Sequence, residues 1–217
     1  RGSWRAVAGG ALVVGDAGGR TRSAPGAKGR LAPAVGRQAE PLIAAAEVVL
    51  VQLEVPLDAV VETASIAAGH GVRVILDPAP AQPLPDALWR HLALITPNVT
   101  EAAALTGREI RDQADARAVA GILLECGVES AIVTLGADGV LVATRQTKTM
   151  IAGLAVEAVD TTAAGDTFAG ALAARLAEGA DLLDASRFAN AAAAMAVTRM
   201  GAQSSVPTRD EITRLHH

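Results

Sequence analysis

Aromatic residues, cysteines and long apolar runs are all scarce in this sequence of 217 residues. Aromatics make up 2% of it and include no tyrosine, which disfavours a surface that stacks the bases of single-stranded nucleic acid. Cysteine occurs once, as Cys126, which excludes an internal disulfide and fits a reducing compartment. The longest apolar runs, such as residues 191–197, fall far short of the roughly 20 residues that a membrane-spanning helix needs. We therefore predict a cytoplasmic protein that spans no membrane.

A large excess of charge of one sign is lacking as well. The chain has 19 Lys and Arg residues against 23 Asp and Glu residues, for a formal net charge of −4. This balance provides no broad basic field of the kind that attracts nucleic acid or anionic lipid, so neither is expected as a partner. Apolar residues, in contrast, are abundant. They make up 51% of the chain, which is enough for one sizeable core.

Short apolar runs alternate with amphipathic stretches from Glu47 onward. The runs with strand character cover residues 48–53, 72–76, 92–95 and 131–135. The stretches with helical periodicity include residues 57–68, 166–177 and 184–199. This alternation predicts an α/β fold, with an open, mostly parallel sheet flanked by helices. Residues 140–143 follow a glycine-bounded turn, so they should pair antiparallel with the preceding strand at one edge of the sheet.

The first 46 residues differ from the rest in their pattern. Gly, Pro and Arg interrupt every apolar run there, and the one feature that emerges is a hairpin over residues 11–14 and 20–24. We therefore divide the chain into an N-terminal segment, residues 1–46, and an α/β core, residues 47–217.

The sharpest chemical signal is a turn of small residues that leads directly into a helix, residues 160–172 (DTTAAGDTFAGAL). Backbone N–H groups at a helix N-terminus favour an anion, and small side chains let a phosphate approach them closely. Asp166 at this place can accept the proton of an attacking hydroxyl while the amides stabilise charge on the transferred group. The alternative is that Asp166 merely caps the helix.

Other polar residues follow the predicted strands. Glu101 comes three residues after Asn98, in a first helical turn from which its carboxylate can project toward a metal-phosphate group. The alternative is capping alone, with Thr100 as the N-cap. Glu54 lies at the carboxyl end of a buried strand, where open α/β sheets bind ligands, although a solvated charge is common there too. Asp77 opens a proline-rich loop, and we assign it only a loop-shaping role.

Together these segments resemble the ribokinase-like family of carbohydrate kinases. The resemblance runs from Glu47 to about Leu215 and rests on residues 160–172, on residues 95–102 (ITPNVTEA) and on residues 196–207 (AVTRMGAQSSVP). It implies a three-layer α/β fold and ATP-dependent phosphorylation of a small-molecule sugar, with D-ribose as the first candidate.

The resemblance also implies how the reaction runs. Asp166 would be the catalytic base, and Glu54 and Asp166 would contact the sugar. Charge on the migrating phosphoryl group would be stabilised by the amides of Ala163, Ala164 and Gly165.

The same resemblance implies a nucleotide site. It places Asn98 beside the phosphates of ATP, and Glu101 where it would organise Mg²⁺ through water. Asn190 would lie beside the adenine, although an Asn in an alanine-rich helix is a weak pointer by itself. The sugar and phosphates of the nucleotide would be held by a strand-end loop that, taken alone, is only a turn. This loop consists of Thr134, Leu135, Gly136, Ala137, Asp138 and Gly139.

A site for a monovalent cation such as K⁺ is implied as well. Asp160 and Ser205 would offer side-chain oxygens, and oxygen ligands suit a hard cation. Backbone carbonyls would come from Thr162, Ala196, Arg199 and Gly201. The alternative is a glycine-stopped helix followed by a loop.

Family members begin with segments that we do not find in this chain. These are a strand with a sugar-binding Asp, a Gly-Gly-Lys-Gly-Ala-Asn segment, and lid strands that also form a homodimer interface. We therefore expect a chain that is truncated at its N-terminus and that turns over weakly or not at all by itself, because a lid excludes water from the transferred phosphate.

Several alternatives to an active sugar kinase stay open. One is a non-catalytic fragment or pseudokinase that binds only nucleotide, and another is a related kinase for a different sugar or a nucleoside. A Rossmann dehydrogenase is disfavoured, because no Gly-x-Gly-x-x-Gly follows an early strand.

Overall fold

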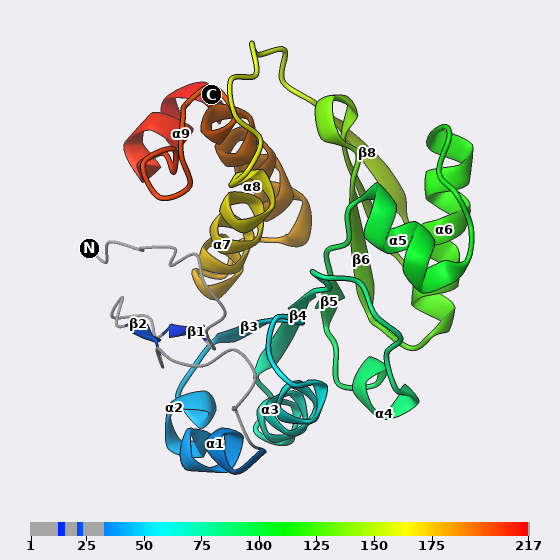
Figure 1. The fold of residues 1–217 in the computed structure, drawn as a ribbon, viewed down its shortest axis with the longest axis vertical. Helices are drawn as coiled ribbons and strands as arrows, with labels where there is room; N and C mark the ends of the chain where they lie inside the picture. The colour runs from blue at the N-terminus through cyan, green and yellow to red at the C-terminus, as the bar shows by residue number, and fades with distance from the viewer. Residues whose placement is uncertain (1–12, 16–20, 24–32, 217) are drawn as a thin grey trace.

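The computed structural model describes residues 13–15, 21–23 and 33–216, and these residues form one eight-stranded sheet flanked by helices (Figure 1). The strands are β1 (Val13–Gly15), β2 (Thr21–Ser23), β3 (Val48–Gln52), β4 (Arg73–Asp77), β5 (Leu94–Ile95), β6 (Ser130–Thr134), β7 (Gly139–Thr144) and β8 (Lys148–Ala152). The helices are α1 (Pro33–Gln38), α2 (Glu40–Ala44), α3 (Leu57–Gly69), α4 (Asp86–Trp89), α5 (Val99–Thr106), α6 (Gln113–Glu125), α7 (Ala164–Ala177), α8 (Leu182–Ala196) and α9 (Arg209–His216), with a 3-10 turn, η1 (Gly136–Asp138), between β6 and β7. Of the helices in these described ranges, none has the length and apolar character to cross a membrane.

The sheet is parallel at its centre and antiparallel at both edges. Its order is β2-β1-β3-β4-β5-β6-β7-β8, and the four strands from β3 to β6 are parallel. β7 and β8 pair antiparallel at one edge, and β1 and β2 do so at the other. The predicted α/β fold is therefore confirmed, as is the hairpin of β6 and β7. β8 escapes sequence analysis because each of its residues is at least partly exposed, so no apolar run marks it.

The N-terminal segment contributes strands to the same sheet. β1 and β2 overlap the two strands of the hairpin predicted for residues 11–14 and 20–24, although β1 extends one residue further, to Gly15, and they pair with each other antiparallel. β1 also pairs with β3. The other parts of that prediction fall on residues 11–12, 20 and 24, which are outside the described residues. The division of the chain after residue 46 stays a prediction.

Helices cover both faces of the sheet. In Figure 1, α7 and α8 lie on one side of the strands and α3 lies on the other. Because side chains alternate along a strand, Val48 and Ile75 point to the first face and pack with Phe168 and Leu172 of α7. The intervening residues, such as Val49, pack into a second core with α3 and α6.

α7 runs antiparallel to β3 and β4. At the start of β4, Nη2 of Arg73 donates to the carbonyl oxygen of Leu176, near the C-terminal end of α7 (2.9 Å). The N-terminal end of α7 therefore lies over the carboxyl ends of β3 and β4, where Gln52 and Asp77 are register partners. Ligands of open α/β sheets bind at this edge, so the fold places the small-residue turn there.

Candidate active site

Asp166 lies in the first turn of α7. The N-cap residue of this helix is Ala163 and no side chain caps it, so the interpretation of Asp166 as a mere cap is wrong. Instead, Oδ1 of Asp166 accepts a hydrogen bond from Nε2 of Gln52 (3.0 Å). The half-buried carboxylate thus sits beside the positive end of the helix dipole and is hydrogen-bonded to a residue of the sheet.

The turn before Asp166 is open on one side. Gly165 is exposed, and a Cβ built on it would meet no atom within 4 Å apart from its chain neighbours and the backbone of its own helix. A phosphate can therefore approach the backbone at Gly165 without meeting a side chain. The amide of Ala164, one of the three predicted phosphate donors, already donates to the carbonyl oxygen of Thr161 (3.2 Å). This hydrogen bond would have to open before the amide could bind a phosphate. The role of Ala163, Ala164 and Gly165 stays a prediction.

Two polar residues beside Asp166 were not predicted as site residues: Gln52 was not singled out, and Asp77 was assigned only a loop-shaping role. Nε2 of Gln52 donates to Oδ2 of Asp77 (2.8 Å) as well as to Asp166. Asp77 is only 7% exposed, and this burial raises the pKa of its carboxyl to about 6. The hydrogen bond from Gln52 opposes that rise, and the negative charges of Glu101, Asp166 and Glu54 add to it. The signal that could have found both residues is strand alternation, which puts the last residues of β3 and β4 on the face that α7 covers.

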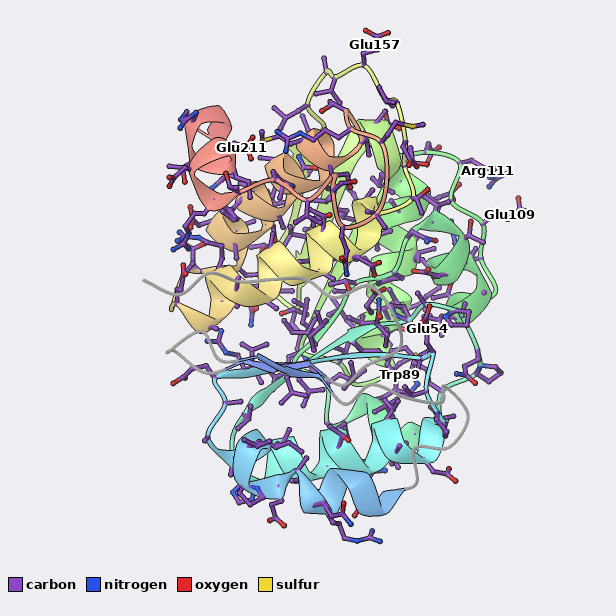
Figure 2. The ribbon with its side chains drawn as sticks, turned by 60° about the vertical axis from the view of Figure 1, so that its left-hand side comes forward. Glu54, Trp89, Glu109, Arg111, Glu157 and Glu211 are labelled. Carbon is purple, nitrogen blue, oxygen red and sulfur yellow. The ribbon has the colours of Figure 1, made fainter. Side chains whose placement is uncertain are left out.

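Glu54 lies two residues beyond the end of β3 and is exposed. Figure 2 shows it close to the plane of the sheet, at a level between the yellow α7 and the cyan α3. Its negative charge helps to raise the pKa of Asp77, so it belongs to the same group of carboxylates as Asp166. The structure thus brings the two predicted sugar contacts to one edge of the sheet.

Asn98 and Glu101 form a capping box at the start of α5, in which each bonds to the other. Asn98 is the N-cap, and its Oδ1 accepts from the amide of Glu101 (2.9 Å), so the assignment of the cap to Thr100 is wrong. In return, the Glu101 carboxylate accepts from the backbone amide and the side-chain Nδ2 of Asn98 (2.9 and 2.8 Å). Burial raises the pKa of Glu101, and these hydrogen bonds oppose the rise. Asn98 forms a β-bridge with Thr134, which joins this pair to the next part of the predicted nucleotide site.

The predicted nucleotide loop closes tightly between β6 and β7. The amide of Leu135 donates to the carbonyl oxygen of Gly139 (2.8 Å), and Gly136 and Gly139 have positive φ angles of 63° and 97°. The end of β8 lies against this loop, because the amide of Gly153 donates to the carbonyl oxygen of Asp138 (3.2 Å).

Asn190 is buried in α8 and contacts the same region. Its Nδ2 donates to the carbonyl oxygen of Ala152, the last residue of β8 (2.9 Å). The structure therefore brings Asn190 and the loop at residues 134–139 to the two sides of the end of β8. A contact of Asn190 with an adenine stays a prediction.

Part of the predicted cation site gathers around Asp160. One carboxylate oxygen, Oδ1, accepts from the amide and hydroxyl of Thr162 (2.9 and 2.5 Å), and Oδ2 accepts from the amide of Gly201 (3.0 Å). These bonds lower the pKa of Asp160. The carbonyl oxygen of Ala196 accepts from the amide of Arg199 (3.1 Å). Ser205 is buried, but its hydroxyl donates to the carbonyl oxygen of Ala202 (2.8 Å) rather than facing Asp160.

The chain is similar to known proteins in sequence and in fold. A family model described as pfkB family carbohydrate kinase matches residues 10–209. The chain belongs to this family. It is 47% identical over 188 residues to a ribokinase of Haemophilus influenzae, and the alignment covers 87% of this chain and 61% of that protein. The chain thus spans about three fifths of the length of that pfkB-family relative.

Solved structures of pfkB-family type have the same fold. The structure of Arabidopsis thaliana ribokinase complexed with ribose and ATP matches with a TM-score of 0.82 and 28% identity, over 91% of this chain and 64% of that one. Phosphofructokinase-2 from Escherichia coli in complex with potassium matches with a TM-score of 0.73 and 27% identity, over 92% of this chain and 67% of that one.

Proposed function

We propose that this chain is the nucleotide-binding and catalytic part of an ATP-dependent ribokinase that converts D-ribose to D-ribose 5-phosphate. The observation that carries the proposal is Asp166, an uncapped carboxylate in the first turn of α7 beside an open, small-residue backbone. A carboxylate that only terminated the helix would bond to its amides, whereas this one is directed by Gln52 at the ligand-binding edge of the sheet. Similarity to the Haemophilus and Arabidopsis ribokinases favours ribose as the acceptor.

In the proposed reaction, Asp166 accepts the proton of the terminal hydroxyl of the sugar. The hydroxyl oxygen bonds to the γ-phosphorus while the bond from phosphorus to the ADP oxygen breaks. The amides of Ala163 and Gly165 would stabilise the charge on the migrating group, with Ala164 joining if its bond to Thr161 opens. Glu54 would orient the sugar hydroxyls.

The phosphates of ATP would lie between Asn98 and the loop at residues 134–139, with the adenine near Asn190. The β-bridge between Asn98 and Thr134 supports this placement, because it makes the two segments into one continuous surface. The hydrogen bond from Asn190 to the end of β8 brings the third segment to the same region.

The residues present fit Mg²⁺ when it is bound through water. No group of three His, Cys, Asp or Glu side chains suited to a metal occurs among the described residues, so phosphate and water must complete its oxygen ligands. Glu101 would hold such a water, because each carboxylate oxygen keeps a lone pair after bonding to Asn98. Bound magnesium supplies positive charge that neutralises the phosphates.

A monovalent cation fits the oxygens around Asp160. The carboxylate of Asp160 and the carbonyls of Thr162 and Gly201 would hold K⁺, since hydrogen bonds already bring these three residues together. Ala196, Arg199 and Ser205 complete the proposed set, in which Ser205 would have to release the carbonyl oxygen of Ala202. The Escherichia coli relative crystallised with potassium supports this assignment.

The substitution Asp166→Asn tests the proposal. It should lower ribose-dependent ADP release by about a hundredfold or more, because it removes the proton acceptor. Calorimetric affinity for ATP with magnesium should stay the same or tighten slightly, since a negative charge near the phosphates is lost. Asp210→Asn, at an exposed position of α9, is the matched control and should change neither value.

Two outcomes would contradict the proposal in different ways. Ribose phosphorylation that persists in Asp166→Asn would show that another group is the base. ATP binding without ribose-dependent turnover in the unsubstituted chain would favour the alternative of a nucleotide-binding fragment or pseudokinase. The same assay with 2-deoxyribose, fructose 6-phosphate and nucleosides in place of ribose tests the acceptor. A cytoplasmic location and a homodimer remain predictions.

A further inference from the structure

The amide of Gln52 bridges two carboxylates that are far apart in the sequence. We propose that Gln52 is a positioning residue: held by Asp77 on one side, it fixes the orientation in which Asp166 meets the acceptor hydroxyl. The inference rests on the proposed role of Asp166 as the base. In this inference two further residues, Gln52 and Asp77, support Asp166 without touching the reacting atoms.

The bridge uses the donor capacity of the amide completely. Nε2 has two hydrogens, one directed to Oδ2 of Asp77 (2.8 Å) and the other to Oδ1 of Asp166 (3.0 Å). An ionised carboxylate only accepts hydrogen bonds, so the nitrogen of the amide, and not its oxygen, must face both partners. With both hydrogens engaged, the plane of the amide is fixed.

The scaffold behind the bridge is rigid. Gln52 and Asp77 are register partners in two parallel strands, so their side chains leave the sheet on the same face. The backbone just beyond them is also tied, because the amide of Leu53 donates to the carbonyl oxygen of Ala79 (3.0 Å). At the other end of α7, the bond from Arg73 to Leu176 holds the helix along the same strands. Asp166 is therefore positioned against a fixed part of the sheet.

A neutral amide suits this task better than a cation would. Arg or Lys beside Asp166 would stabilise its ionised form strongly and make it a poorer proton acceptor. Gln52 provides direction without a full positive charge. Its bond to Oδ1 leaves Oδ2 for the acceptor hydroxyl, which is the geometry that a positioned base needs.

The charge on Asp77 determines which way the amide faces. While ionised, Asp77 attracts Nε2 and keeps the oxygen of Gln52 away from Asp166. Once protonated, Asp77 can donate to that oxygen, so a rotated amide that turns its oxygen toward Asp166 becomes competitive. The pKa of Asp77 is about 6, raised first by burial and then by the charges of Glu101, Asp166 and Glu54 around it. The positioning should therefore be complete well above pH 6, half lost near pH 6, and weaker still as the pH falls further.

The test compares Gln52→Leu with Gln82→Leu in the full chain. Both remove a partly buried amide from neighbouring segments, but the bond of Gln82 runs from Nε2 to a backbone oxygen, that of Leu53 (3.5 Å), and not to a carboxylate. Gln52→Leu should lower kcat for ribose by about tenfold to a hundredfold with KM for ribose and ATP within about twofold, because orientation is lost while the binding groups remain. Gln82→Leu should leave kcat unchanged. Gln52→Asn keeps the amide but shortens its reach, and it serves as the second variant if Gln52→Leu does not fold.

Nuclear magnetic resonance reads the bridge without any turnover. In the unsubstituted chain the side-chain amide protons of Gln52 should shift with an inflection near pH 6. Asp77→Asn should remove that inflection, and Asp166→Asn should shift the signal of the other proton. The χ1 couplings of Asp166 should report one rotamer in the unsubstituted chain and in Gln82→Leu, but an average of rotamers in Gln52→Leu.

The outcomes separate this inference from the proposed function. If the unsubstituted chain phosphorylates no ribose, the proposed function fails, while the Gln52 signals and the Asp166 couplings still decide whether Gln52 orients Asp166. The inference is overturned if the Gln52 protons respond to neither Asp substitution, or if Asp166 keeps one rotamer in Gln52→Leu. Equal kcat values in Gln52→Leu and Gln82→Leu would also overturn it.

Discussion

At the scale of single residues, the end of β8 lies so close to the predicted nucleotide loop that two glycines are required. A Cβ built on Gly139, whose φ is 97°, would lie 2.1 Å from the carbonyl oxygen of Ile151. A Cβ on Gly153 would lie 1.9 Å from the carbonyl oxygen of Ala137. Any side chain at either position must push β8 away from the loop.

Gly139→Ala should therefore lower the free energy of unfolding by about 1–3 kcal/mol, because the strained φ and the clash act together. It should also weaken the binding of ATP. Gly69→Ala is the matched control, since a Cβ at this last residue of α3 meets no atom within 4 Å, and it should raise stability by up to about 0.5–1 kcal/mol. Urea denaturation and calorimetry measure the two effects. Equal stability of the two variants would contradict the argument.

Individual side chains were only partly predictable. Asp166, Asn98 and Glu101 belong to motifs with a recognisable spacing, and the structure gathers them at one edge of the sheet. Gln52 and Asp77 carry no such local pattern. Strand alternation can place them on the face that α7 covers, but the bond between Gln52 and Asp166 joins residues 114 positions apart and has no local signal.

At the scale of elements, helix ends depend on individual caps that periodicity does not locate. Apolar periodicity predicted α3, α7 and α8, because each buries one face against the sheet. Their ends were less predictable. α7 begins at Ala164 and α8 ends at Ala196, where residues 166 and 199 were expected. At α5, the reciprocal bonds of Asn98 and Glu101 make Asn98 the cap, two residues before Thr100.

The cap of α5 gives a test in which stability and binding can be separated. Asn98→Ala should cost about 1 kcal/mol of stability, because it leaves the amide of Glu101 without its acceptor. Asp181→Ala removes the equivalent cap of α8, where Oδ1 accepts from the amide of Asp184 (2.8 Å), and should cost a similar amount. Only Asn98→Ala should also weaken the calorimetric affinity for ATP with magnesium. A similar affinity in both variants would assign Asn98 a capping role alone.

At the scale of the whole molecule, the sheet order depends on contacts between distant segments. The alternation of strands and helices predicted a parallel centre correctly, because a helical crossover between neighbouring strands leaves few other arrangements. The pairing of β1 with β3 and the addition of β8 at the far edge were not predictable in the same way. β1 has only three residues, and each of the five residues of β8 is at least partly exposed, so neither strand is marked by a buried apolar run.

Burial of Asp77 should affect the stability of the whole fold. The pKa of Asp77 is raised from the usual 3.8 to about 6. The stability that its protonated carboxyl contributes to the fold is therefore fully present below pH 3.8 and is lost as the pH rises through 6. The loss at pH 7.5 is about 3 kcal/mol. Asp77→Asn should therefore raise the free energy of unfolding by up to about 3 kcal/mol at pH 7.5, and by about 1 kcal/mol at pH 4.5.

Chemical denaturation at the two pH values measures this difference. Glu129→Gln, at an exposed position, is the control and should show a similar small effect at both. If Asp77→Asn gained no more stability at pH 7.5 than at pH 4.5, the carboxyl would not be buried as the structure shows.

The bonds of Asp160 have a consequence for the pair of helices that follows it. Val159 and Asp160 both donate to the carbonyl oxygen of Val197, and Asp160 accepts from the amide of Gly201. The two ends of segment 159–201, which contains α7 and α8, therefore lie beside each other and are joined by hydrogen bonds. The segment that carries Asp166 is thus closed at its base by the residues for which we propose a cation site.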